Sequence, residues 1–165
     1  MNLMCMRKTM DEKLIKSATD KLNLMDIYLY SSKLNRFEDI FENDYPDEML
    51  QLMKRKISAQ LQESVEDESQ KFLLVKITLG SRFVVKGDKD EIVPLSEVEA
   101  CIAAKYKVKE PLSEDEVTHF SEYNSMHNVW PFWREHAFRV SREARLPIPN
   151  IPFYTNHESS DDKMD

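Results

Sequence analysis

Three histidines, His119, His127 and His136, are the side chains in this sequence best suited to catalysis or metal binding. Histidine ligates zinc and moves protons near neutral pH. These three are not spaced four residues apart, as a zinc-binding helix requires, and no cysteine completes a ligand set. Glu135 and His136 also lack a serine or cysteine nucleophile in a recognisable setting. We therefore expect no catalytic residue, no metal and no cofactor, and interpret the histidines as surface or capping residues.

Four arginines in the same stretch would suit contacts with nucleic-acid phosphates: Arg134, Arg139, Arg142 and Arg145. Glu135 and Glu143 interleave with them, and the chain has a net charge of −7, which disfavours nonspecific nucleic-acid binding. We interpret this stretch as a solvated helix face and expect no nucleic-acid partner.

Noncovalent capture of another polypeptide is the chemistry that an apolar strip near the carboxyl end suggests. Its apolar members alternate with prolines at 147, 149 and 152, and they are Leu146, Ile148, Ile151, Phe153 and Tyr154. Prolines at this density exclude a helix or a central strand, so the strip is predicted to be an extended, stiff loop. Stiffness lowers the ordering cost of binding, so these residues are candidate contacts for an unfolded client. The alternative, that the strip lies on a sheet and closes the core, has equal weight.

The element that must position this strip is an aromatic-rich amphipathic helix. Its apolar residues are spaced by three and four, which places them on one face: Trp130, Trp133, Ala137 and Val140. Such a stripe is typical of a core or an oligomer interface rather than a ligand site, and we expect an oligomer interface here. Pro131 suits the first turn of this helix, which is predicted to run to about Arg145.

Length and composition limit the possible classes of protein. A chain of 165 residues fits one domain. Its two glycines exclude glycine-rich phosphate loops and the dinucleotide fingerprint. The two cysteines are too few for a disulfide framework, and neither a signal peptide nor an apolar run of membrane-spanning length is recognised. We therefore expect a cytoplasmic protein without membrane insertion.

Strands and helices are predicted in an α+β arrangement. Strands are expected at residues 22–37, with a break near Ser31, and at 72–86, with a bend at Gly80. Ser96 and Glu99 have capping-box spacing, so a helical segment is predicted within residues 88–112. Ser113 and Glu116 repeat the spacing and predict a helix through Met126. Residues 49–63 fit a helix and a strand about equally. Residues 1–21 are expected to be a loosely ordered or helical lead-in, and residues 155–165 an acidic, disordered tail.

The segment NVWPFWR at 128–134, followed by a helix and then LPIPNIPF, resembles the SecB family of bacterial chaperones. The family shares an aromatic–proline–aromatic helix start, a following arginine and a proline-containing apolar linker. Residues 24–37 and 72–87 are also similar to the family's first and last strands. The resemblance spans residues 22–154 with interruptions.

The resemblance implies an antiparallel sheet of about four strands with a long helix packed on one face, and it favours a strand at 49–63. It also implies a homotetramer, built as a dimer of dimers, that holds non-native polypeptides without ATP. In the type case SecB delivers preproteins to the Sec translocase, whereas divergent members protect the antitoxin of a toxin–antitoxin pair.

Three differences from the family pattern favour the second role. We expect the second C-terminal helix to be shortened or absent and residues 88–112 to be an inserted helical segment. Little room is expected between Phe41 and Met49 for a separate second strand. We therefore expect a holdase with a dedicated client such as an antitoxin. General preprotein export is the alternative, and a small enzyme with a histidine-centred site ranks below both.

Overall fold

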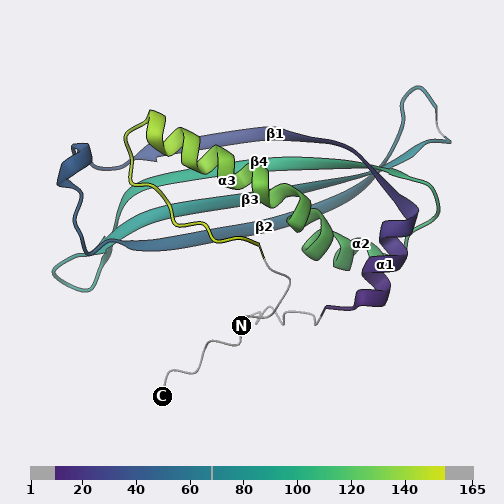
Figure 1. The fold of residues 1–165 in the computed structure, drawn as a ribbon, viewed down its shortest axis with the longest axis horizontal. Helices are drawn as coiled ribbons and strands as arrows, with labels where there is room; N and C mark the ends of the chain where they lie inside the picture. The colour runs from purple at the N-terminus through teal and green to yellow at the C-terminus, as the bar shows by residue number, and fades with distance from the viewer. Residues whose placement is uncertain (1–9, 68, 155–165) are drawn as a thin grey trace, which may run out of the picture.

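A four-stranded antiparallel sheet with helices on one face forms the computed structural model, which describes residues 10–67 and 69–154 (Figure 1). The strands are β1 (Leu22–Arg36), β2 (Leu50–Glu63), β3 (Lys71–Lys86) and β4 (Ile92–Val108). Their order in the sheet is β1-β4-β3-β2, so β1 and β2 are the edges. This confirms the predicted α+β class and the sheet of about four strands.

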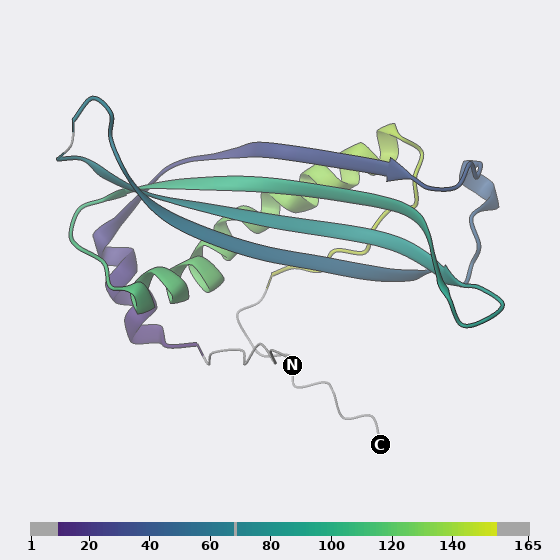
Figure 2. The same cartoon turned by 180° about the vertical axis from the view of Figure 1, so that it is seen from behind.

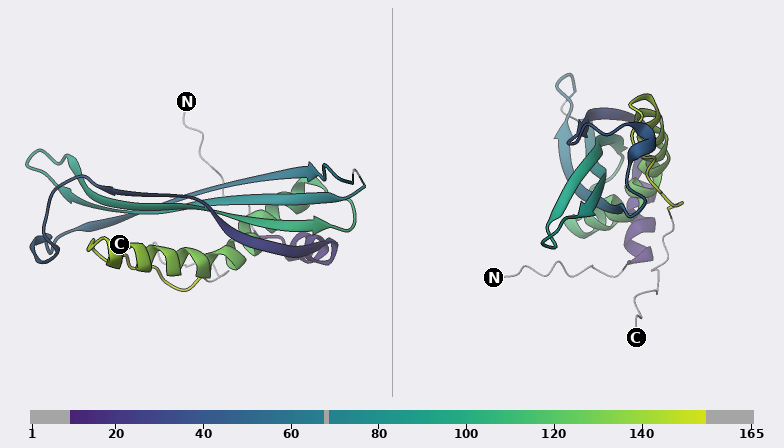
Figure 3. Two further views of the ribbon diagram at one scale, coloured as in Figure 1. Left: turned by 90° about the horizontal axis from the view of Figure 1, so that it is seen from above. Right: turned by 90° about the vertical axis from the view of Figure 1, so that its left-hand side faces the viewer.

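The helices follow one another along one side of the sheet, as the view from above shows (Figure 3). Helix α1 (Glu12–Lys21) leads directly into β1, and a short 3₁₀ turn, η1 (Glu42–Asp44), lies between β1 and β2. After β4, the helix α2 (Glu114–His119), the π-helical segment η2 (Phe120–Ser125) and the helix α3 (Met126–Glu143) form one helical run. The expected lead-in is therefore helical from residue 12, whereas residues 1–9 and the expected tail at 155–165 lie outside the described residues.

The core lies between α3 and the two central strands. Side chains of β3 and β4 alternate between the two faces of the sheet. We call the face under α3 the helix face and the other the open face. The helix face buries Leu73, Val75, Ile77 and Leu79 of β3 and Ala100, Ile102, Ala104 and Tyr106 of β4. Val129, Trp133 and Ala137 of α3 pack against them and are fully buried.

The predicted helical segment within residues 88–112 is wrong, because most of it is strand β4. Ser96, Glu99 and several alanines gave this segment helical propensity. In the structure β4 is a central strand: β3 pairs with it from Ile92 to Val108, and β1 pairs with it from Ser96 to Val108. Ala100 and Ala104 lie under α3, where small side chains let the helix approach the sheet. Tertiary pairing therefore overrides the local propensity.

Two further predictions about helices and strands agree with the structure, and two do not. Residues 50–63 form β2, as the family resemblance implied. The capping box of Ser113 and Glu116 is present at the start of α2. Pro131 does not begin the main helix, because the helical run starts at Glu114 and Pro131 lies inside α3. Gly80 does not bend β3; the irregularity in that strand lies between Phe83 and Val84.

The two edge strands differ in regularity. Strand β2 pairs with β3 without a register shift from Leu50 to Glu63. Strand β1 has register shifts against β4 between Leu24 and Asp26 and between Leu29 and Ser31. The second shift corresponds to the break predicted near Ser31. Bulges of this kind twist an edge and blunt its pairing, so β2 is the more regular unpaired edge.

Candidate functional site

The proline-rich strip of residues 146–154 lies beside α3 on the helix face and runs back along the sheet from the end of the helix (Figure 1). Its side chains divide into two sets. Leu146 and Ile151 belong to the core, with 4% and 2% of their surface exposed. Ile148 and Phe153 point to solvent, with exposures of 47% and 79%. Tyr154 is half-buried. One side of the strip therefore closes the core, and the other offers apolar surface.

Hydrogen bonds from both neighbouring elements fix the strip. From α3, Arg134 Nε donates to the Ile151 carbonyl at 3.0 Å, and Trp130 Nε1 donates to the Pro152 carbonyl at 2.8 Å. From β2, Gln51 Nε2 donates to the Asn150 carbonyl at 3.0 Å, and the Asn150 amide donates to Gln51 Oε1 at 2.8 Å. These contacts satisfy backbone groups that no strand pairs. The exposed side chains therefore project from a rigid support.

An aromatic cluster marks the end of the strip. The ring of Tyr154 lies 5.4 Å from that of Trp130, and Arg134 lies over the ring of Phe153 at 4.4 Å. The Tyr154 hydroxyl donates to the Glu122 carbonyl at 3.4 Å. Burial raises the pKa of Tyr154, so its hydroxyl stays protonated and able to donate.

A groove continues from this cluster between β2 and the first helices of the helical run. Strand β2 supplies its apolar floor with Ile57, Ala59 and Leu61, and the opposite wall comes from Leu112, Val117 and Ser121. Its volume is about 470 Å³. Glu122 lines the groove and also bonds to Tyr154, so strip and groove form one continuous track on the helix face. The Ser121 hydroxyl is buried and has no hydrogen-bond partner within residues 10–67 and 69–154.

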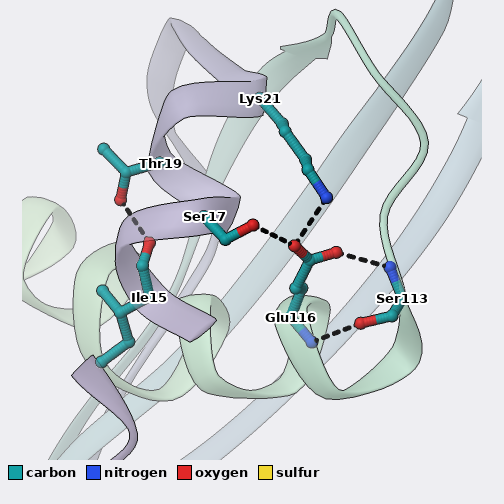
Figure 4. A network of polar contacts seen from close by, with 6 residues as sticks. All are labelled: Ile15, Ser17, Thr19, Lys21, Ser113 and Glu116. Carbon is teal, nitrogen blue, oxygen red and sulfur yellow. Dashed lines mark hydrogen bonds and ion pairs between the residues drawn. The ribbon is translucent and has the colours of Figure 1, made fainter. Parts of the chain in front are cut away.

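A network around Glu116 holds the α2 wall of this groove in place (Figure 4). Glu116 accepts hydrogen bonds from Lys21 Nζ and Ser17 Oγ, both at 2.6 Å, and from the Ser113 amide at 2.8 Å. These bonds, that from Lys21 above all, lower the pKa of Glu116 to about 2. The carboxylate is therefore charged at neutral pH and ties α1 to α2.

The stripe expected at an oligomer interface is divided between two environments. Trp133 and Ala137 are fully buried within the single chain, against the sheet, which makes them core residues. Trp130 and Val140 are half-buried and keep some surface. The sequence allowed either a core or an oligomer interface for this stripe. Its two central residues, Trp133 and Ala137, lie in the core.

A second apolar surface, which the sequence analysis missed, lies along β1. Helix α3 packs mainly over β4 and covers the helix face of β1 only in part. The register of β1 against Tyr106, Ile102 and Val98 of β4 places three leucines there, and each is 41–50% exposed: Leu24, Leu29 and Leu34. Their spacing of five residues reflects the two bulges. Strict alternation of side chains along a strand does not predict that these leucines share a face, because each bulge shifts the alternation by one residue.

The histidines do not converge on one point. His119 Nδ1 donates to the Asp115 carbonyl at 2.9 Å, and the Nε2 atom of His136 lies 2.8 Å from the Ser32 hydroxyl. Burial first, and Arg139 second, lower the pKa of His136. His127 lies against Tyr154, with ring centroids 6.1 Å apart. Within residues 10–67 and 69–154, no three His, Cys, Asp or Glu side chains are placed to hold a metal ion.

Comparison with solved structures identifies the fold. The SecB-like chaperone Rv1957 of Mycobacterium tuberculosis, in complex with a ChAD peptide from the Rv1956 HigA1 antitoxin, superposes with a TM-score of 0.67. The match covers 89% of this chain and 100% of that chain at 11% sequence identity. The fold is SecB-like. This agrees with the resemblance found in the sequence at residues 128–154.

Other comparisons add little to this result. A protein of unknown function from Streptococcus agalactiae matches with a TM-score of 0.37 and 17% identity, over 80% of this chain and 97% of that chain. No protein-family model and no curated protein sequence matches the chain. In the described part of the chain, no helix has the length and apolar character needed to cross a membrane.

Proposed function

We propose that this protein is an ATP-independent holdase that binds a non-native polypeptide along the helix face. The observation that carries the proposal is the continuous track formed by the exposed side of the strip, the aromatic cluster and the groove beside β2. The SecB-like fold supports it, because the similar structure from Mycobacterium tuberculosis is that of a chaperone in complex with a peptide.

The unpaired edge of β2 gives this track a way to bind without sequence specificity. An extended client segment can add to β2 through backbone hydrogen bonds, which do not depend on side chains. Alternate side chains of that segment then point toward the groove floor of Ile57, Ala59 and Leu61. Each large apolar side chain buried there contributes about 1.5–3 kcal/mol before ordering costs are subtracted.

The proposed client is a dedicated partner such as an antitoxin. The similar chaperone was solved with an antitoxin peptide, and a rigid strip with two projecting side chains, Ile148 and Phe153, favours one preferred segment over many. General delivery of preproteins to the Sec translocase is the alternative client class. A pull-down with the full chain distinguishes them: a single small partner supports the first, and a broad set of secretory precursors supports the second.

The protein is further proposed to act as a homo-oligomer. The exposed leucines of β1 form an apolar surface that a lone chain leaves in water. The bulges of β1 disfavour strand addition at this edge, so the leucines themselves are the expected contact. An oligomer places several client tracks within reach of one long polypeptide and raises avidity.

The holdase proposal is tested with the purified full chain and chemically denatured luciferase as the model client. The chain is expected to suppress light scattering when chains are in several-fold molar excess over client, with no nucleotide or metal added. The groove variant Ala59→Glu with Leu61→Glu is expected to lose most of this suppression, because two carboxylates would then line the apolar floor.

The matched control carries the same charges outside the track. Phe41 and Val65 are 82% and 101% exposed, in the connections on either side of β2. Phe41→Glu with Val65→Glu is expected to suppress aggregation as the wild type does. Equal loss in both double variants, or suppression only in the presence of ATP, would refute the proposed holdase.

A further inference from the structure

The open face of the sheet, seen from behind in Figure 2, carries a charge opposite to that of the whole chain. Strand register assigns its residues, because partners across the sheet point to the same face. Its carboxylates are Asp26, Glu97 and Glu99. Its cations are Lys33, Lys54, Lys56, Lys76, Arg82, Lys105 and Lys107. Seven cations against three carboxylates make this face basic in a chain of net charge −7.

Only part of this positive charge is neutralised within the face. Arg82 pairs with Glu97 at 3.1 Å, and Lys54 pairs with Glu99. Among the described residues, no carboxylate forms an ion pair with the remaining five lysines: Lys33, Lys56, Lys76, Lys105 and Lys107. The five lie on all four strands, so they present a two-dimensional array of ammonium groups.

Aromatic rings lie among these lysines. The ammonium of Lys76 sits over the ring of Tyr30 at 4.0 Å, and that of Lys105 sits over the ring of Phe72 at 4.2 Å. The centre of the face is apolar, because Leu74 and Ala103 are buried there between the charged rows. The surface thus combines cations with aromatic rings that hold two of them in place. The side chains of this surface lie on the opposite face of the sheet from those that line the holdase track.

We propose that the open face is a docking surface for an acidic, extended polypeptide segment of a partner protein. Lys105 and Lys107 are two residues apart on one strand, and carboxylates on alternate residues of an extended peptide have the same spacing. The rings of Tyr30 and Phe72 accept the aliphatic parts of such a segment. Electrostatic complementarity of this kind sets orientation and speeds association.

Polypeptide fits this face better than nucleic acid. Single-stranded nucleic acids bind through stacking of bases on free aromatic faces. Here one face of Tyr30 and one of Phe72 are already covered by lysine ammonium groups. The net charge of −7 also repels a polyanion of high charge density more strongly than a short acidic peptide.

Fluorescence anisotropy with the full chain and a labelled 16-residue peptide of alternating glutamate and serine tests the proposal. Saturable binding is expected, with an affinity that falls as salt rises. Lys56→Glu with Lys107→Glu is expected to weaken binding at least about ten-fold, because it reverses two unpaired charges. The matched control, Lys13→Glu with Lys16→Glu on α1, is expected to change it less than about two-fold, since α1 lies away from this face.

Each other outcome contradicts the proposal. Absence of saturable binding would show that the open face does not bind the acidic peptide. Equal weakening by the open-face variant and the α1 control would show the same. Tighter binding of a labelled 16-residue oligothymidine would assign the face to nucleic acid. Equal binding of a peptide of residues 155–165 would assign it to the chain's own carboxyl segment. Circular dichroism checks folding, and Lys33→Gln with Lys56→Gln repeats the test without adding negative charge.

Binding of the acidic peptide to the open face can be tested separately from client capture on the helix face. Ala59→Glu with Leu61→Glu should leave binding of the acidic peptide unchanged while client capture is lost. Conversely, Lys105→Glu with Lys107→Glu, both on the central strand β4, should weaken binding of the acidic peptide and leave suppression of luciferase aggregation unchanged. Loss of both activities in either variant would contradict two independent faces.

Discussion

Ile148 and Ile151 are three residues apart in the strip, yet one is 47% exposed and the other 2%. Ile148→Asp with Phe153→Asp is therefore expected to weaken client capture at least ten-fold while the melting temperature changes by less than about 2 °C, since neither side chain packs in the core. Ile151→Asp is expected to unfold the chain or lower its stability by more than about 3 kcal/mol, because it buries a charge. Thermal denaturation and client titration measure both effects.

Phe41→Asp with Val65→Asp is the control for this comparison, because both residues are more exposed than Ile148 and lie off the track. It should change neither property. Wild-type stability in Ile151→Asp would show that Ile151 is not a core residue, and equal client binding by the strip variant and the control would show that the strip does not contact the client.

Trp133 carries the largest burial of any single side chain in the core. Trp133→Ala is expected to lower the free energy of unfolding by about 3–5 kcal/mol, through lost burial and the cavity that remains. Urea denaturation measures this change. Trp130→Ala serves as the comparison, because Trp130 is half-buried, and a smaller loss is expected there. Equal losses would mean that Trp133 does not occupy the core as described.

At the scale of elements, the Glu116 network joins α1 to the wall of the groove. Glu116→Gln is expected to cost about 1–3 kcal/mol, because the amide keeps the shape but not the charge-assisted bond to Lys21. Hydrogen exchange should show faster opening of α1 in the variant, with β3 unchanged. Protection of α1 equal to that in the wild type would show that the network does not anchor this helix.

The same network gives a pH dependence. The pKa of Glu116 is lowered to about 2 in the folded chain from an ordinary value of 4.5. A lowered pKa means that the carboxylate stabilises the fold above pH 4.5 and that this contribution is lost as the pH falls toward 2. Denaturation midpoints measured between pH 5 and 2.5 should fall more steeply for the wild type than for Glu116→Gln. Parallel curves would contradict the assignment.

Sequence patterns correctly predicted the elements for which local propensity favours the same structure as packing in the fold. Strand β3 is apolar and β-branched, and the capping box at Ser113 works as its spacing predicts. Strand β4 was missed because its alanines and its Ser96–Glu99 spacing favour a helix locally, while its pairing with two neighbours decides the outcome. Pro131 looked like a helix start, yet the helical run passes through it. A short stretch of sequence does not show which strands will pair with it, nor whether a helix has already begun before it.

At the scale of the whole molecule, the sheet offers three unlike surfaces: the track beside β2, the leucines of β1 and the basic open face. The sequence predicted the strip at 146–154 but not which of its residues face water. That depends on the hydrogen bonds that Arg134 of α3 and Gln51 of β2 make to its backbone. The β1 leucines are hidden in the sequence by two bulges. The charge of the open face becomes visible only when four strands are aligned.

The β1 surface carries a prediction about assembly. Leu29→Glu with Leu34→Glu is expected to convert an oligomer into a monomer, because two charges would replace apolar contacts at an interface. Light scattering coupled to size-exclusion chromatography measures the mass. The matched variant Leu50→Glu with Leu52→Glu, on the other edge strand, should retain the wild-type mass. A monomeric wild type, or an unchanged mass in the β1 variant, would contradict the proposed interface.

Hydrogen exchange of the full chain, with and without a denatured client, tests the central claim most directly. The account predicts slower exchange in β2, in residues 113–122 and in the strip at 146–154 when client is present, with no change on the central strands. Protection of other segments alone, or no protection at saturating client, would contradict the assignment of the helix-face track as the place where foreign polypeptide is held.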